Sequence, residues 1–264
     1  MAILKLASHD VHYQSFGDAS KPTVIFSNSL GTNLSMWTPQ VEALQAAYHV
    51  VCYDTRGHGL SGAPKGPYAL AQLGEDVVAL LAHLNLAKAH FCGISMGGIT
   101  GLWLAINHPE RFLSVTVSNS AAKIGQEGPW RERAALVREQ GLQPIASTAA
   151  GRWFTEAFVA SHADTIREMQ HNLAAGSAEG YASCCEALAV ADVRAQLPEI
   201  RIPLLVIAGS ADPVTTVADG QAMQTAIPAC QLHEIAASHI SNIERPDDFN
   251  QALHRFVQGL GNQR

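Results

Sequence analysis

The sequence predicts an α/β protein with a mostly parallel sheet of eight strands, flanking helices and an inserted helical cap. Short runs of β-branched and apolar residues alternate with segments that repeat apolar residues at helical spacing. That alternation is the pattern of a parallel sheet whose strands are joined by helical crossovers. It stops between residues 121 and 197, where we expect helices and no strand. This stretch is too long for one crossover and therefore predicts a cap.

The expected elements follow in order along the chain. Strands are expected at residues 2–7, 11–16, 23–27, 49–53, 87–92, 112–117, 203–209 and 230–236. The first two predict a hairpin, and the continuously apolar third predicts a strand buried on both faces. Helices are expected at 36–47, 70–84, 99–108, 131–140, 144–154, 164–175, 179–189, 217–226 and 246–260. We therefore assign residues 1–120 and 198–264 to the core and residues 121–197 to the cap.

Composition excludes several classes of protein. The 264 residues are 47% hydrophobic and 15% charged, as in globular proteins. The net charge of −6 argues against nucleic acid or an anionic membrane as partner.

No signal peptide and no apolar run of roughly 18 residues is seen. Five cysteines without a C-x-x-C pair predict reduced thiols and a cytoplasmic protein. We expect no metal or organic cofactor, and the sequence leaves a homo-oligomer open.

The pattern Gly93-x-Ser95-x-Gly97 lies between an expected strand and an expected helix. This is the context of a nucleophile elbow, a tight turn that exposes a serine above the end of the strand. Side chains that flank such a tight turn would clash, and glycines on either side of the serine avoid the clash because they have no Cβ. An ordinary Gly-Ser turn is the alternative, and the flanking strand and helix favour the elbow.

A serine hydroxyl needs a base, and the base needs an orienting acid. Ligands of open α/β sheets bind outside the carboxyl ends of the strands, so we searched the loops that follow them. Asp212 follows the strand at 203–209, and His239 follows the strand at 230–236. Asp212 precedes a proline and could merely start a turn. The chain order Ser95, Asp212, His239 is nevertheless that of the α/β-hydrolase triad.

Acyl transfer at a serine also requires donors for the developing oxyanion. One donor is expected to be the backbone N–H of Met96, directly after the nucleophile. The second should come from the polar loop at residues 28–33, where the Leu30 N–H is the candidate and a plain turn is the alternative. In the loop at residues 54–59, we expect Arg56 and His58 to brace the structure through hydrogen bonds.

Several motifs resemble the 3-oxoadipate enol-lactonases, a family of α/β-hydrolases of the bacterial β-ketoadipate pathway. The resemblance rests on Ser-Asn-Ser-Leu-Gly at 27–31, Tyr-Asp-Thr-Arg-Gly-His-Gly at 53–59, the elbow at 90–98, residues 239–244, and the cap strings at 152–155 and 180–185. It also includes Asp212-Pro213 with Ala218-Asp219-Gly220. The resemblance implies hydrolysis of 3-oxoadipate enol-lactone to 3-oxoadipate through an acyl-enzyme, without a cofactor.

The implied substrate carries a free carboxylate, which an acidic protein must meet with a local cation. Arg133 is our choice, with Trp130 and Trp153 as apolar walls. The other candidates are Arg131, Arg138, Arg152, Arg167 and Arg194, and each arginine could instead only solvate a helix. Two alternatives stay open for the function. One is another serine hydrolase, such as a carboxylesterase, a different lactonase or a carbon–carbon bond hydrolase. The other is a non-catalytic receptor for a small molecule.

Overall fold

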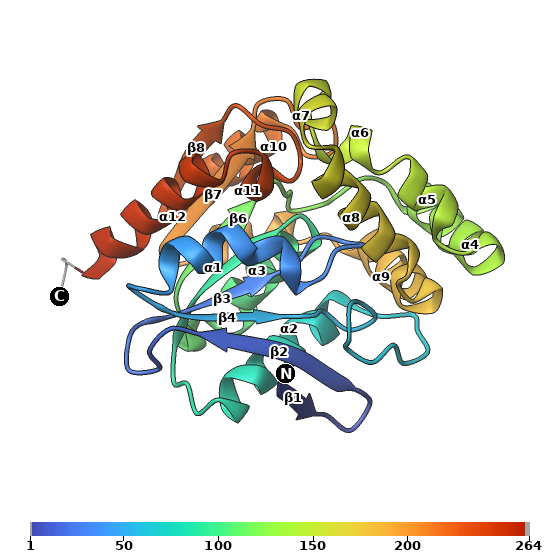
Figure 1. The fold of residues 1–264 in the computed structure, drawn as a ribbon. Coiled ribbons are helices and arrows are strands. Elements are labelled where there is room, and N and C mark those ends of the chain that lie inside the picture. The colour runs from blue at the N-terminus through green and yellow to red at the C-terminus, as the bar shows by residue number, and fades with distance from the viewer. Residues whose placement is uncertain (1, 262–264) are drawn as a thin grey trace.

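A computed structural model describes residues 2–261 of the chain, and within them eight strands form one sheet (Figure 1). The strand order is β1-β2-β4-β3-β5-β6-β7-β8. The strands are β1 (Ala2–Lys5), β2 (Asp10–Phe16), β3 (Thr23–Ser27), β4 (His49–Tyr53), β5 (Ala89–Ile94), β6 (Phe112–Ser118), β7 (Leu204–Gly209) and β8 (Cys230–Ile235). β2 runs antiparallel to β1 and β4, and all other neighbours are parallel. The predicted α/β fold is confirmed.

The centre of the sheet is fully enclosed. Every residue of β3, β4 and β5 is buried, which explains why these strands have no alternation of apolar and polar residues. In the parallel pairing of β3 with β5, Ser27 lies opposite Gly93. The two strands therefore end side by side, and this register brings the loop after β3 next to the elbow after β5.

Helices cover both faces of the sheet (Figure 1). They are α1 (Thr38–Leu44), α2 (Leu70–His83), α3 (Met96–Asn107), α10 (Val217–Ala226), α11 (Ser241–Glu244) and α12 (Pro246–Gly261), with the 3-10 turns η1 (Leu34–Trp37), η2 (Pro109–Arg111) and η3 (Arg194–Glu199). α1 packs against α12 on one face, and α2 packs against α3 on the other. The fully buried Trp37 joins the layers, because its ring lies 4.6 Å from Phe26 and 6.1 Å from Phe249 between ring centroids.

Between β6 and β7 the chain forms six α-helices within the described residues, and these helices, at residues 127–190, make up most of the expected cap of residues 121–197. Its helices are α4 (Glu127–Gln140), α5 (Gln143–Ser147), α6 (Ala150–Trp153), α7 (Glu156–Ser161), α8 (Ala163–Ala174) and α9 (Ala178–Val190). They gather at one end of the sheet (Figure 1). The connections from β3 and β5 also leave the sheet at this end, so the cap covers the loops that the sequence analysis singled out.

The prediction of one helix at 144–154 is wrong, because the chain breaks between α5 and α6. Thr148 follows α5, and its hydroxyl turns back onto the carbonyl groups of Pro144 and Ile145 at 3.4 and 3.3 Å. Such side-chain bonds compete with the helical backbone pattern. α7 was not expected either. It begins after Thr155, whose side chain accepts a hydrogen bond from the Phe158 N–H and caps the helix.

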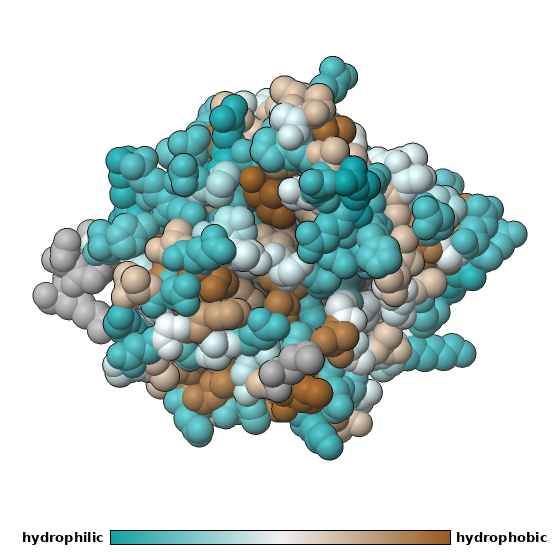
Figure 2. Space-filling model, in the orientation of Figure 1, coloured by the Kyte–Doolittle hydropathy of each residue, from teal (hydrophilic) through white to brown (hydrophobic). Residues whose placement is uncertain are grey.

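The face of the molecule in Figure 2 is mostly hydrophilic, with separate apolar patches. Among the large apolar side chains of the described part, Ile3, Leu60, Val190 and Val214 are exposed. No helix between residues 2 and 261 has both the length and the apolar character needed to cross a lipid bilayer.

Candidate active site

Ser95 occupies the turn between β5 and α3 in a strained backbone conformation. Its φ of 56° and ψ of −114° lie outside the regions that side chains with a Cβ favour. A Cβ on Gly93 would lie 2.1 Å from the carbonyl oxygen of Gly97, and one on Gly97 would lie 2.3 Å from that of Ser27. Only glycine therefore fits on either side of the serine. The Ser95 N–H donates to the Ser118 carbonyl at 2.9 Å and holds the turn against β6.

His239 and Asp212 form a buried pair behind the serine. Nδ1 of His239 lies 2.8 Å from Oδ2 of Asp212, and both residues are buried. Asp212 also accepts backbone N–H bonds from Val214 at 2.7 Å and Thr215 at 3.1 Å. Burial raises the pKa of Asp212, but the hydrogen bond and charge of His239 and the bond from Val214 outweigh it, so the pKa lies below its ordinary value. The pair therefore holds an ionised carboxylate against one nitrogen of the imidazole and leaves Nε2 for another partner.

Asn119, which the sequence analysis missed, completes the surroundings of the acid. Its Nδ2 donates to Oδ2 of Asp212 at 3.1 Å and to the Ser238 carbonyl at 3.0 Å. It lies in the loop after β6, which carries no carboxylate and therefore offered no candidate for the acid. Its position at the carboxyl end of a strand was the available signal. Asn119 links the loop of the acid to the loop of the histidine.

One cavity of about 270 Å³ joins the core to the cap above these residues. Both Ser95 and His239 line it, and within the described chain the Ser95 side chain forms no hydrogen bond with another residue. The structure brings six of the residues chosen as catalytic, oxyanion-hole or substrate-binding candidates to this cavity, namely Leu30, Ser95, Trp130, Arg133, Trp153 and His239. Asp212 lies behind His239, and Met96 has its side chain in the core as the first residue of α3.

Two arginines face the cavity from the cap. Arg133 lies over the ring of Trp130, with its guanidinium carbon 5.0 Å from the ring centroid. Arg152, which we weighed in the sequence but did not choose, lines the same cavity directly before Trp153. Burial, together with the charge of Arg133, lowers the pKa of Arg152. The adjacent Arg152-Trp153 pair was the signal that could have found this second cation.

The other cap arginines behave differently. Arg131, Arg138, Arg167 and Arg194 each form an ion pair, with Glu127, Glu179 and Glu186, Asp164, and Asp192, respectively. Among residues 2–261, neither Arg133 nor Arg152 has such a carboxylate partner. Two half-buried guanidinium groups without a carboxylate partner favour the binding of an anion in the cavity. They argue against the alternative that each arginine only solvates its helix.

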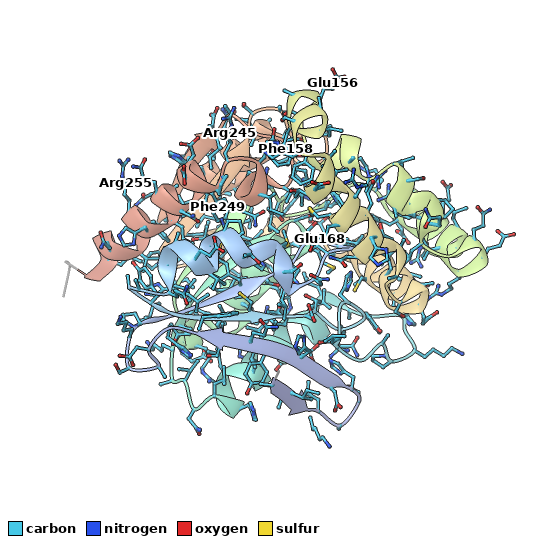
Figure 3. The ribbon with its side chains drawn as sticks, in the orientation of Figure 1. Glu156, Phe158, Glu168, Arg245, Phe249 and Arg255 are labelled. Carbon is cyan, nitrogen blue, oxygen red and sulfur yellow. The ribbon has the colours of Figure 1, made fainter. Side chains whose placement is uncertain are left out.

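The cap wall is tied to the loop that carries His239. The Ile240 N–H donates to the carbonyl of Trp153 at 2.9 Å. Glu244 of α11 accepts the Ser238 N–H at 2.8 Å and a hydrogen bond from the Thr155 hydroxyl. These contacts fix the end of α6 relative to the catalytic histidine candidate. Phe158 of α7 lines a separate pocket between the cap and the core. Figure 3 labels this residue.

The loop at residues 54–59 is braced as the sequence predicted, and it also holds the loop after β3. Nε2 of His58 accepts the Gly31 N–H at 2.9 Å, and the guanidinium of Arg56 donates two bonds to Asp76 at 2.7 and 2.6 Å. The prediction that Arg56 and His58 act through bracing hydrogen bonds is confirmed. Leu30, one residue before Gly31, lines the cavity.

Comparison with known proteins identifies the family of this chain. Residues 22–246 match the family model of the alpha/beta hydrolase fold. The chain is 60% identical to 3-oxoadipate enol-lactonase 2 of Acinetobacter baylyi, over 96% of both chains. It is 50% identical to 3-oxoadipate enol-lactonase 1 of the same organism, over 92% of this chain and 91% of that one.

A solved structure is similarly close. The crystal structure of the enol-lactonase from Burkholderia xenovorans LB400 superposes with a TM-score of 0.95 at 42% identity, covering 97% of this chain and 100% of that one. Identity at this level over almost the whole length extends through both the sheet and the cap. The chain therefore belongs to the α/β-hydrolase family and, within it, to the 3-oxoadipate enol-lactonases.

Proposed function

We propose that this protein hydrolyses 3-oxoadipate enol-lactone to 3-oxoadipate, with Ser95 as the nucleophile. The relationship to the enol-lactonases supports the substrate. The observation that carries the proposal is the cavity itself, in which the serine and histidine share one space with two arginines that have no carboxylate partner among the described residues. That combination suits an ester group at one end of a small molecule and a carboxylate at the other.

In the first step, Oγ of Ser95 attacks the lactone carbonyl carbon while Nε2 of His239 takes the hydroxyl proton. Asp212 keeps the imidazole oriented through Nδ1 and stabilises its cationic form. The backbone N–H groups of Leu30 and Met96 donate to the oxyanion that develops on the carbonyl oxygen. These roles follow from the loops that carry the residues, with Met96 at the N-terminus of α3.

Collapse of the tetrahedral intermediate breaks the bond between the acyl carbon and the ring oxygen. The leaving enolate oxygen takes the proton from His239, and the enol then becomes a ketone. The opened chain remains attached to Ser95 as an ester, because both ends belong to one molecule. Water, deprotonated by His239, attacks this ester, and the second intermediate releases the dicarboxylate and returns the proton to Ser95.

Arg133 and Arg152 bind the free carboxylate of the substrate in this proposal, and Trp130 and Trp153 enclose its carbon chain. A guanidinium pairs well with a carboxylate because its planar fork of donors matches two oxygens. Hydrolysis of the acyl-enzyme, the last step of the reaction, creates a second carboxylate at the Ser95 end of the cavity.

We also propose that residues 121–197 act as one cap on a core of residues 1–120 and 198–264. Close packing of α4 along α9 supports this division. We further propose that the reaction takes place in the cytoplasm. The five cysteines form no disulfide and four of them are buried, which supports a reducing setting.

A spectrophotometric assay with the enol-lactone generated in situ tests the proposal. The wild-type protein should remove the lactone absorbance over many turnovers, and Ser95→Ala should lower kcat by about 10⁴-fold or more. A wild-type protein that cleaves simple esters but leaves the lactone untouched would reject the substrate while keeping the serine chemistry. A single turnover would instead identify a receptor.

A further inference from the structure

The loop formed by residues 29–32 is a thin wall between two hollow spaces. Ser29 and Leu30 line the active-site cavity. Gly31 and Thr32 line a second hollow of about 350 Å³ on the other side, between the core and the cap. Hollow space therefore lies on both sides of this loop, although Gly31 itself is closely packed, since a Cβ there would lie 2.8 Å from Leu173. Hydrogen bonds also act on the loop and set the direction of its peptide groups.

The peptide between Ser29 and Leu30 is held from the far side by Thr32. The Ser29 carbonyl accepts the Thr32 N–H at 3.2 Å and the Thr32 hydroxyl at 2.8 Å. The same hydroxyl oxygen lies 2.9 Å from the sulfur of Met36, which is a much weaker acceptor. In a planar trans peptide the C=O and the N–H point in opposite directions. A carbonyl fixed toward Thr32 therefore directs the Leu30 N–H away from Thr32.

The next peptide is held by His58. Its Nε2 accepts the Gly31 N–H, and its Nδ1 lies 3.2 Å from the carbonyl of Arg56. This pattern requires the neutral ring, with the proton on Nδ1. Burial lowers the pKa of His58, which keeps the acceptor nitrogen free of a proton at neutral pH. Hydrogen bonds thus hold two consecutive peptide groups, one through the Ser29 carbonyl and the next through the Gly31 N–H.

We propose that Thr32 is a positioning residue which, together with His58, prevents the peptide between Ser29 and Leu30 from flipping. A flip would turn the Leu30 N–H away from the reacting carbonyl and aim the Ser29 carbonyl at the oxyanion. The inference rests on the proposed role of Leu30 as an oxyanion donor. Neither Thr32 nor His58 lines the active-site cavity, so both act through the backbone.

Thr32→Val tests the proposal with p-nitrophenyl acetate and the enol-lactone as parallel substrates. The change removes the hydroxyl bond but keeps the shape and the backbone N–H bond. We expect kcat to fall about fivefold on both substrates, the equivalent of one hydrogen bond, with KM unchanged because the oxyanion forms only in the transition state. Thr32→Ser, which keeps the hydroxyl, should restore kcat.

Thr38→Val is the matched control. The Thr38 hydroxyl donates to the Ser35 carbonyl at 2.8 Å with the same three-residue spacing, but it lies at the end of η1. This variant should keep the wild-type kcat. An unchanged kcat in Thr32→Val, an effect on KM alone, or equal losses in the two valine variants would overturn the proposal.

The pair His58→Leu and His58→Gln provides a second measurement, which decides the matter if Thr32→Val does not fold. Leucine removes the acceptor for the Gly31 N–H, whereas the glutamine carbonyl can replace it. The leucine variant should have the lower kcat, and equal values would contradict the proposal. The two substrates separate the hypotheses, because failure on the lactone alone rejects only the proposed substrate. A wild-type protein inactive on both would reject both.

Discussion

The two walls of the active-site cavity are built in different ways. The core wall carries Ser95 and His239 on loops at the ends of buried parallel strands, and neighbouring backbone groups leave space only for glycine beside the serine. The cap wall carries Arg133 and Arg152 on helices α4 and α6, and α6 is a single short turn. The proposed chemistry therefore sits on rigid backbone, whereas the proposed recognition of the substrate relies on side chains that can be exchanged.

The largest effect is expected from changing the acid of the core wall. Asp212→Asn should lower kcat by about 10⁴-fold, because an amide favours the wrong tautomer of His239, while KM changes little. Steady-state kinetics on the lactone measure this. Asp192→Asn, which alters surface pairs with Arg194 and Lys123 outside the cavity, is the control and should keep the wild-type kcat. Similar losses in both variants would remove the distinction between the walls.

Glycine substitutions compare the rigidity of the two walls directly. Gly97→Ala places a Cβ 2.3 Å from a backbone oxygen, and we expect it to lower the free energy of unfolding by about 3 kcal/mol. Gly151 in α6 has no atom within 4 Å of such a Cβ, so Gly151→Ala should stabilise the protein by about 0.4–1 kcal/mol. Urea unfolding curves give both values. Equal effects would show that the core wall is no more constrained than the cap.

Selectivity is expected to depend on the cap wall. Arg133→Ala should lower kcat/KM for the charged lactone roughly 10- to 100-fold, the equivalent of one charged hydrogen bond, with a much smaller effect on a neutral ester. Arg138→Ala is the matched control, because Arg138 binds Glu179 and Glu186 outside the cavity. It should leave the ratio between the two substrates unchanged. An equal loss on both substrates in Arg133→Ala would argue against carboxylate binding.

The smallest effect concerns the ion pairs that join α4 to α9. Hydrogen bonds from Arg138 lower the pKa of Glu179 from its ordinary 4.5 to about 2. Because the folded-state pKa is the lower one, the stabilisation is present above pH 4.5 and disappears as the pH falls toward 2. Glu179 is more than a third exposed, so solvent screening limits the contribution to about 1 kcal/mol. Arg138→Met should therefore be less stable than wild type at pH 7, by a difference that shrinks at pH 4 or in high salt.

Much of the core could be predicted from local patterns. The buried strands β3, β4 and β5 each contain a mostly apolar run, so their positions were visible without knowledge of their neighbours. The cap was harder. Thr148 ends α5 with its own side chain, and such short-range competition does not alter the apolar spacing on which the expected helix at 144–154 was based. Whether core and cap act as separate units stays a prediction.

The sequence by itself indicated the elbow around Ser95, because the glycine pattern and its flanking strand and helix are consecutive in the chain. The clash that requires glycine at 93 comes from within the turn, whereas the clash at 97 comes from Ser27 of β3. It also supplied Asp212 and His239 through chain order and strand ends. Only the tertiary structure decided which cap arginines lack an acidic partner, since an ion pair such as that of Arg138 with Glu179 joins residues distant in the sequence. The same holds for Asn119 and for the bond between His58 and Gly31. Contacts of this kind depend on which elements pack against each other in the fold. The order of residues along the chain does not specify the distances between those elements.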